Sequence, residues 1–471
     1  RFILFGERAR DGDFALGDLA AVRSSPHRVS HDFEGFTERD IFSPTLILNH
    51  FGETLEFTSI SGFAWWKTFD ATDLDTTPVD LVVRRNDENL WQFTQEFRLA
   101  TPQDAPVVLN DRVDLRWLLG TFLFYSDYDQ DASNSLSAAA AAAIPVPFAF
   151  NDQSQADLDN MGLAVFGQAT LTVDEKLDVI LGARLDYEHK EATLDTFTTP
   201  ITAPPVHEQF SEHFTEVSPR VGLAYHLTDD AMVYANWSRG FKAGGFNAVA
   251  PAGEAEIAEE TSSTYEVGVK VQGWDDQLTV NAALFHIDWE DLQLDVPNLM
   301  VPGRFFVDNV GKARSSGFEV ETNLQVRPGW DVFGGVGYLD TRFHSGSTTL
   351  GAPIGGNDLP FAPHTTWNVG TQFQQDLECC GLILYGRAEV TGYSGYFYEA
   401  TNAANQDTFN LANFRLGVRK GNWNAEAWVR NAFDTDYVPL AFPFDPALTP
   451  SGFAGEAGAP VTYGVTVGIR F

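Results

Sequence analysis

The clearest alternation of apolar and polar residues in the chain lies at its C-terminal end, over residues 461–471. Every second side chain there is large and apolar, and the residues between them are small or polar. A period of two sustained over this length predicts a β-strand with one apolar face. A tilted strand of about 9–11 residues is what crosses a bilayer in a β-barrel. We therefore predict a membrane-spanning strand whose apolar face consists of Tyr463, Val465, Val467, Ile469 and Phe471.

The same alternation recurs along the chain. It is clear at 177–188, 217–227 and 318–326, where each stretch has one apolar face and one face that carries charged groups. A strand of a water-soluble sandwich also has a buried face and a solvated face, so the local pattern fits both architectures. The connections between the strands distinguish a membrane barrel from a soluble sandwich.

These connections alternate between short turns and long loops. The short turns fall at 174–176, 228–230, 273–277, 327–329, 377–380 and 421–422. The long loops fall at about 70–87, 128–159, 194–213, 243–258, 294–303, 344–361 and 439–459. Short turns at one end and long loops at the other are typical of an up-and-down membrane barrel. Neither a sandwich nor a propeller requires this asymmetry.

The predicted fold class is therefore all-β: a transmembrane, antiparallel, up-and-down β-barrel over residues 1–471, with long extracellular loops and short periplasmic turns. About 20 strands are recognisable from the alternation. The strands near 1–9, 13–23, 27–36 and 41–50 have the weakest patterns. A barrel of roughly this size has a lumen that its own side chains cannot fill, and at about 22 strands it is typically plugged.

Composition agrees with strands rather than helices as the membrane-spanning elements. The chain has 471 residues, and no apolar run approaches the roughly 18 residues of a transmembrane helix. The net charge of -35 argues against nucleic acid as a partner, because phosphate binding needs a positive surface. Cys379 and Cys380 are adjacent and are the only cysteines, which excludes a disulfide framework. We expect two reduced thiols in a turn, although a vicinal disulfide or a metal site is an alternative.

No motif for catalysis is present. The chain lacks a G-x-S-x-G elbow, an H-E-x-x-H helix, a phosphate-binding loop and a C-x-x-C pair. The sequence therefore predicts neither an enzyme nor a bound cofactor or metal. The acidic residues Asp70, Asp73, Asp75 and Asp80 lack EF-hand spacing and are expected to be solvated. Most tryptophans are expected in the aromatic girdles at the membrane interfaces.

Ligand contacts are expected in the long loops, because loops on a rigid scaffold carry recognition. His207 and His213 in the predicted 194–213 loop are candidates for an extracellular ligand site, and so is Asn298 in the 294–303 loop.

An ordered series of short motifs resembles the barrel of the TonB-dependent outer-membrane receptors. The motifs include SPRVGL at 218–223, YEVGVK at 265–270 and GFE at 317–319. The remaining members of the series are 95–99, 234–247, 285–289, 309–316, 360–364, 431–437 and the terminal Phe471. Most of these positions are expected to serve the fold: Gly317 for a close backbone approach, and Asn431 and Asp434 for ending a strand.

The resemblance implies a receptor in the outer membrane of a Gram-negative-type bacterium, with lipid around its barrel. The terminal aromatic resembles the signal by which such barrels are recognised for assembly, and the last strand would close the barrel against the first. The implied function is uptake of an iron–siderophore complex or a similar scarce nutrient. The implied partners are a small-molecule metal chelate, a plug domain and, with the plug, a TonB-type energy-coupling protein.

One feature of the family is not recognisable in this sequence. Receptors of this family carry an N-terminal plug domain, and their barrels have about 22 strands. We expect the plug, and the first two strands, to be missing upstream, contributed by a separate chain, or lost. The alternative function is a plugless or divided barrel that acts as a passive pore or as a structural component of an envelope assembly.

Overall fold

The main element of the protein is one large antiparallel sheet. The computed structural model describes residues 1–140, 149–200, 204–249, 253–298, 304–378 and 380–470. The sheet contains 19 strands, close to the number predicted. They are β1 (Phe2–Gly12), β3 (Phe36–Phe51), β4 (Glu56–Asp73), β5 (Val82–Ala100), β6 (Val107–Asn110), β7 (Val113–Leu136), β8 (Phe150–Val173), β9 (Leu177–Thr199), β10 (Val206–Thr228), β11 (Ala231–Lys242), β14 (Glu260–Gly273), β15 (Leu278–Glu290), β18 (Ala313–Arg327), β19 (Trp330–Phe343), β22 (Thr365–Leu377), β23 (Leu382–Tyr393), β26 (Phe409–Lys420), β27 (Trp423–Arg430) and β30 (Thr462–Ile469).

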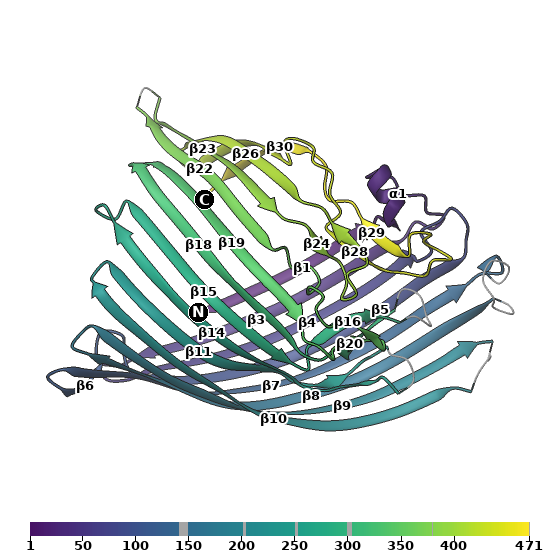
Figure 1. Ribbon diagram of the computed structural model, residues 1–471, viewed down its shortest axis with the longest axis horizontal. Coiled ribbons are helices and arrows are strands. Elements are labelled where there is room, and N and C mark those ends of the chain that lie inside the picture. Colours follow the sequence, from purple (N-terminus) through teal and green to yellow (C-terminus); the bar gives the residue numbers. More distant parts are fainter. Residues whose placement is uncertain (141–148, 201–203, 250–252, 299–303, 379, 471) are drawn as a thin grey trace.

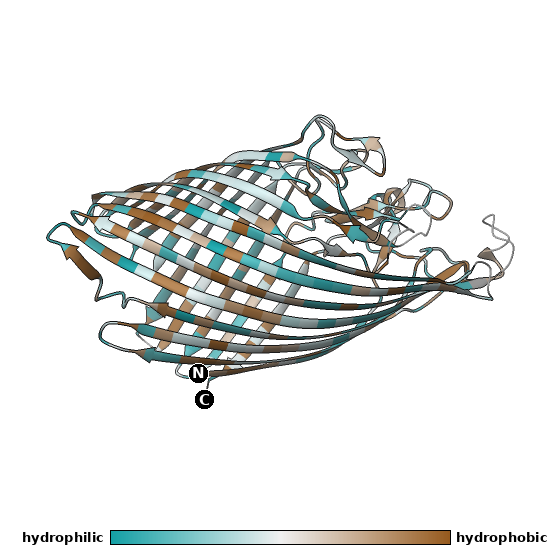
Figure 2. Cartoon of the chain, turned by 90° about the horizontal axis from the view of Figure 1, so that it is seen from below, coloured by the Kyte–Doolittle hydropathy of each residue, from teal (hydrophilic) through white to brown (hydrophobic). Residues whose placement is uncertain are grey.

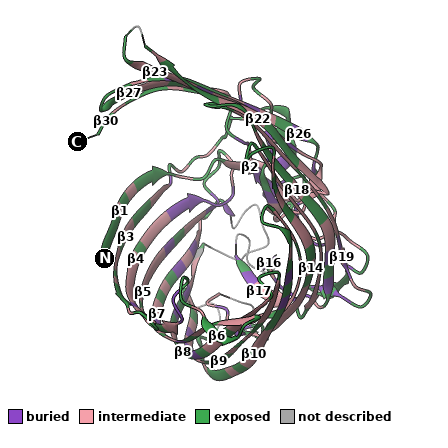
Figure 3. Ribbon diagram, turned by 90° about the vertical axis from the view of Figure 1, so that its left-hand side faces the viewer, coloured by how far each residue is buried: buried purple, intermediate pink, exposed green. Residues whose placement is uncertain are grey.

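These strands follow an up-and-down order around an open interior (Figures 1 and 3). Apart from the short β6, which pairs with the start of β7, each strand pairs with the next main-sheet strand along the chain. The predicted fold class is confirmed. Figure 3 shows the edges of β1 and β30 lying apart, and the described residues include no pairing between these two strands. Closure of the ring by β30 therefore stays a prediction, and Phe471 lies outside the described residues.

The outer face of the wall carries an apolar belt. Leu181 and Leu185 of β9 are each 48% exposed, and the intervening Arg184 points to the other face, over the rings of Phe122 and Phe166. The alternation of hydrophobic and hydrophilic positions along the strands is visible in Figure 2. In β30, Tyr463, Val465, Val467 and Ile469 form the exposed apolar face, as predicted. Among the described residues, no helix is long and apolar enough to cross a membrane.

Aromatic residues mark one border of this belt. Trp65 of β4 lies opposite Trp91 of β5, and the rings of Trp91 and Tyr125 are 5.1 Å apart. Tryptophan and tyrosine favour the interface between the apolar and polar parts of a bilayer. Trp66 is an exception to the expected girdle, because it points to the lumen and lies 6.1 Å from the ring of Tyr128.

All six predicted short turns are confirmed, and they gather at one end of the sheet, on the left in Figure 1. The long connections gather at the other end. Cys380 is exposed in the turn between β22 and β23, whereas Cys379 lies outside the described residues. Asn431 ends β27 as predicted. Its φ is 45°, and its Nδ2 donates hydrogen bonds to Thr435 O at 3.0 Å and to Ala459 O at 3.1 Å.

Two predicted strands, 13–23 and 27–36, are wrong. The segment instead contains the short β2 (Leu16–Asp18), the helix α1 (Leu19–Ser24) and a loop that leads into β3. Asp18 caps α1, because its Oδ1 accepts hydrogen bonds from Ala20 N and Ala21 N, each at 3.1 Å. Leu19 and Val22, three residues apart, share one helix face and are 3% and 4% exposed. A six-residue helix is too short to produce a clear helical period.

Three of the predicted long loops, 70–87, 128–159 and 194–213, are mostly strand. β4 continues to Asp73 and β5 begins at Val82. β9 continues to Thr199 and β10 begins at Val206, so little of 194–213 is loop. β7 and β8 each have 24 residues and occupy most of 128–159. These strands are far longer than the roughly ten residues that a bilayer requires, so they extend beyond the apolar belt. Residues 141–148 of the predicted 128–159 loop lie outside the described residues.

Gly317 occupies a position that has no room for a side chain. A Cβ added there would lie 2.1 Å from Tyr338 O and 2.7 Å from Phe285 Cζ. Gly317→Ala is therefore expected to destabilise the barrel by about 1–3 kcal/mol through overpacking. The measurement is the temperature at which the detergent-solubilised protein loses its compact form on an unboiled SDS gel. Gly273→Ala is the control, because nothing lies within 4 Å of its added Cβ; equal melting temperatures for the two variants would contradict this account.

Candidate ligand-binding vestibule

At the long-loop end, short hairpins line and cover the lumen. Figure 3 shows β16 and β17 inside the ring of strands. Each hairpin pairs internally or with a neighbouring hairpin rather than with the wall. The pairs are β12 (Gly245–Phe246) with β13 (Glu256–Ile257), β16 (Gln293–Pro297) with β17 (Phe305–Asn309), β20 (Thr348–Thr349) with β21 (Ala352–Pro353), β24 (Tyr396–Phe397) with β25 (Asn405–Gln406), and β28 (Leu440–Pro443) with β29 (Phe453–Glu456). We call the space beneath these hairpins the vestibule.

Apolar clusters hold the hairpins to the wall. In the largest, Phe306 of β17 packs with Phe343 at the end of β19 and with Ile354 of the loop that follows β21. These three side chains are 5%, 2% and 0% exposed. In a second cluster, Phe246 and Ala255 of the β12–β13 hairpin pack on Ala156 and Ala192 of the wall. Burial of this kind stabilises by about 25 cal/mol per Å² of apolar surface, so the hairpins are fixed rather than loose.

Arg304 anchors the β16–β17 hairpin to the inner wall. Its side chain is only 5% exposed, and its Nη1 donates a hydrogen bond to Ser154 Oγ at 2.8 Å. Its Nη2 lies 3.0 Å from Asp152 Oδ2, close in distance but off the hydrogen-bond axis. Burial lowers the pKa of Arg304 from its ordinary value, and the Asp152 carboxylate opposes that shift.

Asn247 joins two hairpins into one unit. Its Nδ2 donates to Val307 O at 2.9 Å, and Val307 N donates to its Oδ1 at 2.8 Å. This pair of bonds imitates a β-ladder between the β12–β13 and β16–β17 hairpins. Beneath them is a cavity of about 200 Å³, lined by Arg84, Tyr128, Gln130, Asn247, Arg304 and Phe305 among others. Two guanidinium groups, a phenol and two amides give this cavity a strongly polar lining.

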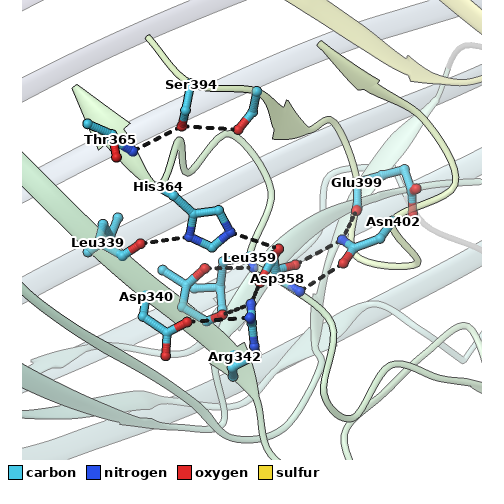
Figure 4. Close-up of polar contacts among 12 residues, drawn as sticks. Leu339, Asp340, Arg342, Asp358, Leu359, His364, Thr365, Ser394, Glu399 and Asn402 are labelled. Carbon is cyan, nitrogen blue, oxygen red and sulfur yellow. Dashed lines mark hydrogen bonds and ion pairs between the residues drawn. The ribbon is translucent and has the colours of Figure 1, made fainter. Parts of the chain in front are cut away.

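A second polar network fixes the rim beside β19 and β22 (Figure 4). Asp358 forms ion pairs with Arg342, at the end of β19, and with His364 Nε2 at 3.3 Å. His364 Nδ1 lies 2.8 Å from Leu339 O. Asp358 also bonds the next loop through its backbone, because Asp358 N donates to Asn402 Oδ1 at 2.8 Å and Asn402 Nδ2 donates to Asp358 O at 3.0 Å. Asp358 thus connects the wall with two loops, through its carboxylate and its backbone.

The histidine candidates from the sequence do not line the vestibule. His207 and His213 lie in β10, not in a loop. Phe210 of the same strand stacks on Phe246 inside the ring, with the ring centroids 5.4 Å apart. Because side chains alternate along a strand, His207 and His213 point to the opposite, outer face of the wall. His207 Nδ1 lies 2.8 Å from Asp195 Oδ1, and His213 lies opposite His189. Both histidines are therefore separated from the lumen by the wall itself.

Asn298 lies inside the ring but serves the hairpin. It is 5% exposed, and its backbone N donates to Arg304 O at 2.8 Å, next to the end of β16. The three candidates therefore do not converge on one site. Sequence reasoning missed Arg304 and Asp358, because neither belongs to a motif and because the partners of Arg304, Ser154 and Asp152, are 150 or more residues away along the chain.

Two of the predicted solvated aspartates are buried. Asp73 and Asp75 are each 1% exposed and lie with Asp32 in a group whose carboxylate oxygens are within 4.8 Å of one another. Backbone amides stabilise both carboxylates: Asp73 accepts from Asp32 N at 3.0 Å, and Asp75 accepts from Val82 N at 2.8 Å. These bonds account for the burial, because a carboxylate that accepts amide hydrogen bonds is compensated for lost hydration.

A long-stranded antiparallel wall with an apolar outer belt, a charged inner face and hairpins packed into one end is the architecture of a large membrane-spanning β-barrel. A profile of the family described as TonB dependent receptor-like, beta-barrel matches residues 6–432. The chain belongs to this family.

Individual relatives agree with this assignment. The pesticin receptor of Yersinia pestis is 26% identical over 313 residues, which are 65% of this chain and 43% of that protein. The catecholate siderophore receptor Fiu of Escherichia coli O157:H7 is 26% identical over 332 residues, which are 65% of this chain and 41% of that protein. The chain thus spans less than half of the length of these relatives.

Solved structures show the same fold. The ferric yersiniabactin uptake receptor FyuA from Yersinia pestis superimposes with a TM-score of 0.78 at 20% identity, covering 93% of this chain and 62% of that one. The siderophore receptor PiuA from Acinetobacter baumannii gives a TM-score of 0.75 at 15% identity, covering 99% of this chain and 71% of that one.

Proposed function

We propose that this chain is the barrel of a TonB-dependent receptor that takes up an iron–siderophore complex across a bacterial outer membrane. The observation that carries the proposal is family membership over most of the chain, together with relatives named as siderophore receptors. The vestibule supports it, because fixed hairpins over a wide lumen provide a preformed recognition surface. The proposed partners are the metal chelate, a plug domain and a TonB-type coupling protein.

The proposed location in the outer membrane also sets which end of the barrel faces the exterior. The long-loop end with the vestibule faces the exterior, where a scarce nutrient is captured, and the short-turn end faces the periplasm. The groups around the 200 Å³ cavity suit the oxygen-rich periphery of an iron chelate, since they include the guanidinium groups of Arg84 and Arg304.

Uptake of radiolabelled iron by the native host tests the proposal. Deleting the coding sequence is expected to abolish uptake of iron from at least one class of chelate, for example a catecholate, under iron limitation. An uncoupler of the inner-membrane proton gradient should abolish the same uptake. Uptake that persists with the uncoupler and depends only on solute size would favour the passive-pore alternative and contradict the proposal.

A matched pair of tyrosines localises the binding surface. Tyr128→Ala removes a vestibule side chain and is expected to raise the dissociation constant of the transported chelate by fivefold or more, about 1 kcal/mol. Tyr265→Ala removes a tyrosine that is 49% exposed on the outer belt and should leave the constant unchanged. The measurement is quenching of intrinsic fluorescence by the chelate in detergent. Equal effects of the two substitutions would place the ligand elsewhere.

A further inference from the structure

The small cavity beneath the vestibule hairpins is lined by two cations, and its described lining includes no carboxylate. Arg84 of β5 and Arg304, which directly precedes β17, supply the charges, while Phe305, Ala248 and Val249 supply apolar surface. The cavity volume of about 200 Å³ equals that of roughly six or seven water molecules at about 30 Å³ each. The cavity therefore holds one small chemical group, such as an arm of a chelate, rather than a whole chelate.

The guanidinium group of Arg304 has a donor that the described residues leave unused. Its Nη1 donates to Ser154 Oγ at 2.8 Å. Its Nη2 is buried and has no hydrogen-bond acceptor among the described residues, although Asp152 Oδ2 lies 3.0 Å away, off the hydrogen-bond axis. A buried donor without an acceptor destabilises the folded protein, so an oxygen atom placed in the cavity would be stabilising.

The charges around the cavity favour an anion as the source of that oxygen. Burial lowers the pKa of Arg304, the Asp152 carboxylate opposes this shift, and the positive charge of Arg84 adds to it. Two like charges that line the same cavity repel each other, and an anion between them attracts both. The planar guanidinium group also matches the geometry of a carboxylate.

Gln130 adds an unused acceptor to the same cavity. Its Nε2 donates to Asn86 Oδ1 at 2.9 Å and to Glu88 Oε1 at 3.0 Å. Because an ionised carboxylate only accepts hydrogen bonds, Glu88 fixes the orientation of this amide. Gln130 Oε1 is buried and has no donor among the described residues. Since Gln130 lines the cavity, an occupant that carries a hydroxyl group would satisfy this oxygen.

We propose that this cavity binds a carboxylate of the transported chelate together with a hydroxyl group on the adjacent carbon. The carboxylate accepts hydrogen bonds from the guanidinium groups of Arg304 and Arg84, and the hydroxyl donates to Gln130 Oε1. Phe305 contacts the carbon skeleton. The receptor therefore selects chelates that present a free α-hydroxycarboxylate arm, which does not ligate the iron. This inference rests on the proposed receptor function and deepens it by naming the substrate class.

Two small acids that differ by one hydroxyl group test the assignment. Lactate carries a carboxylate and an α-hydroxyl group on six non-hydrogen atoms, and propionate lacks only the hydroxyl. The protein is extracted in mild detergent from the outer membrane of its host, and dissociation constants are measured by saturation-transfer difference NMR. Lactate is expected to bind at least fivefold more tightly than propionate, because propionate leaves Gln130 Oε1 without a donor.

Substitutions separate the two contacts. Gln130→Met is expected to abolish the preference for lactate while most of the propionate binding remains. Asp152→Ala/Arg304→Met removes the buried ion pair as a unit and should weaken binding of both acids at least tenfold. Gln168→Met is the matched control, because this lumen-face glutamine lies opposite Gly182, outside the cavity, and it should bind both acids like the unaltered protein. Mobility on an unboiled SDS gel verifies that each variant folds.

Equal binding of lactate and propionate by the unaltered protein, or binding of neither, would overturn the inference. Displacement of lactate by inorganic phosphate at a lower concentration than by propionate would also overturn it, because the cavity would then be a phosphate site. Loss of both acids in Gln130→Met would contradict the role given to Gln130. These measurements do not involve uptake, so the inference can fail while energy-dependent uptake of iron is observed. A lactate preference without such uptake would overturn the proposed function alone.

Discussion

Replacing Leu181 with arginine is expected to impair insertion of the barrel by about 2–4 kcal/mol, the cost of a charged side chain near the bilayer midplane. Leu181 lies on the outer face of β9, 48% exposed, between Leu177 at the short-turn end and Tyr187 toward the long-loop end. Its wall neighbours are Val221 and Ala169, so an arginine there has no acidic partner at the same level. The yield of folded protein in the membrane fraction should fall more than tenfold.

Gln168→Arg is the control for this prediction. Gln168 lies opposite Gly182, one residue from Leu181, and is exposed on the lumen face beside Arg184. Water in the lumen hydrates an arginine at this position, so the yield should stay close to that of the unaltered protein. Equal yields from the two variants would mean that the faces of β9 are assigned incorrectly.

Asp152→Ala is expected to release the β16–β17 hairpin from the wall. Removing one partner of a buried ion pair leaves an uncompensated charge and costs about 3–5 kcal/mol. The Arg304 side chain is 5% exposed and that of Asp152 is 14% exposed, so solvent can replace the lost partner only if the hairpin moves. Hydrogen exchange measured by mass spectrometry should speed up in 293–309, while exchange in the β22–β23 hairpin stays unchanged.

The double variant Asp152→Ala/Arg304→Met separates charge from packing. Methionine fills much of the space without a charge, and exchanging a buried pair for apolar residues is often close to neutral. Exchange in 293–309 should therefore return most of the way to that of the unaltered protein. If the double variant exchanges as fast as Asp152→Ala, the ion pair is not what holds the hairpin.

The membrane-spanning part of this protein could be predicted from the sequence because each strand contacts lipid along one face and the lumen along the other. Lipid requires an apolar residue at every second position, and the lumen tolerates the polar residues between them, so stretches such as 177–188 carry a strong period of two. The six short turns were also predictable, since few residues can join two strands so tightly. Gly317 and Asn431 were assigned correctly, because close backbone approach and left-handed backbone restrict the residue type locally.

The predictions of long loops failed where the strands extend beyond the lipid bilayer. Beyond Tyr125 the outer face of β7 becomes Asp127, Asp129 and Asp131, and the alternation of apolar and polar residues disappears. The strand nevertheless continues, because hydrogen bonds to β5 and β8 stabilise it on both sides. For this reason His207 and His213 were expected in a loop, and the 194–213 segment proved to be mostly strand.

The sequence by itself thus determined the class of fold, the direction of its faces, the end that carries the long loops and the resemblance to a receptor family. Only the tertiary structure decided what those loops build. The anchors of the vestibule, Arg304 with Asp152 and Asp358 with His364, join residues that no local pattern relates. The register between strands is likewise fixed by the whole wall rather than by any one segment.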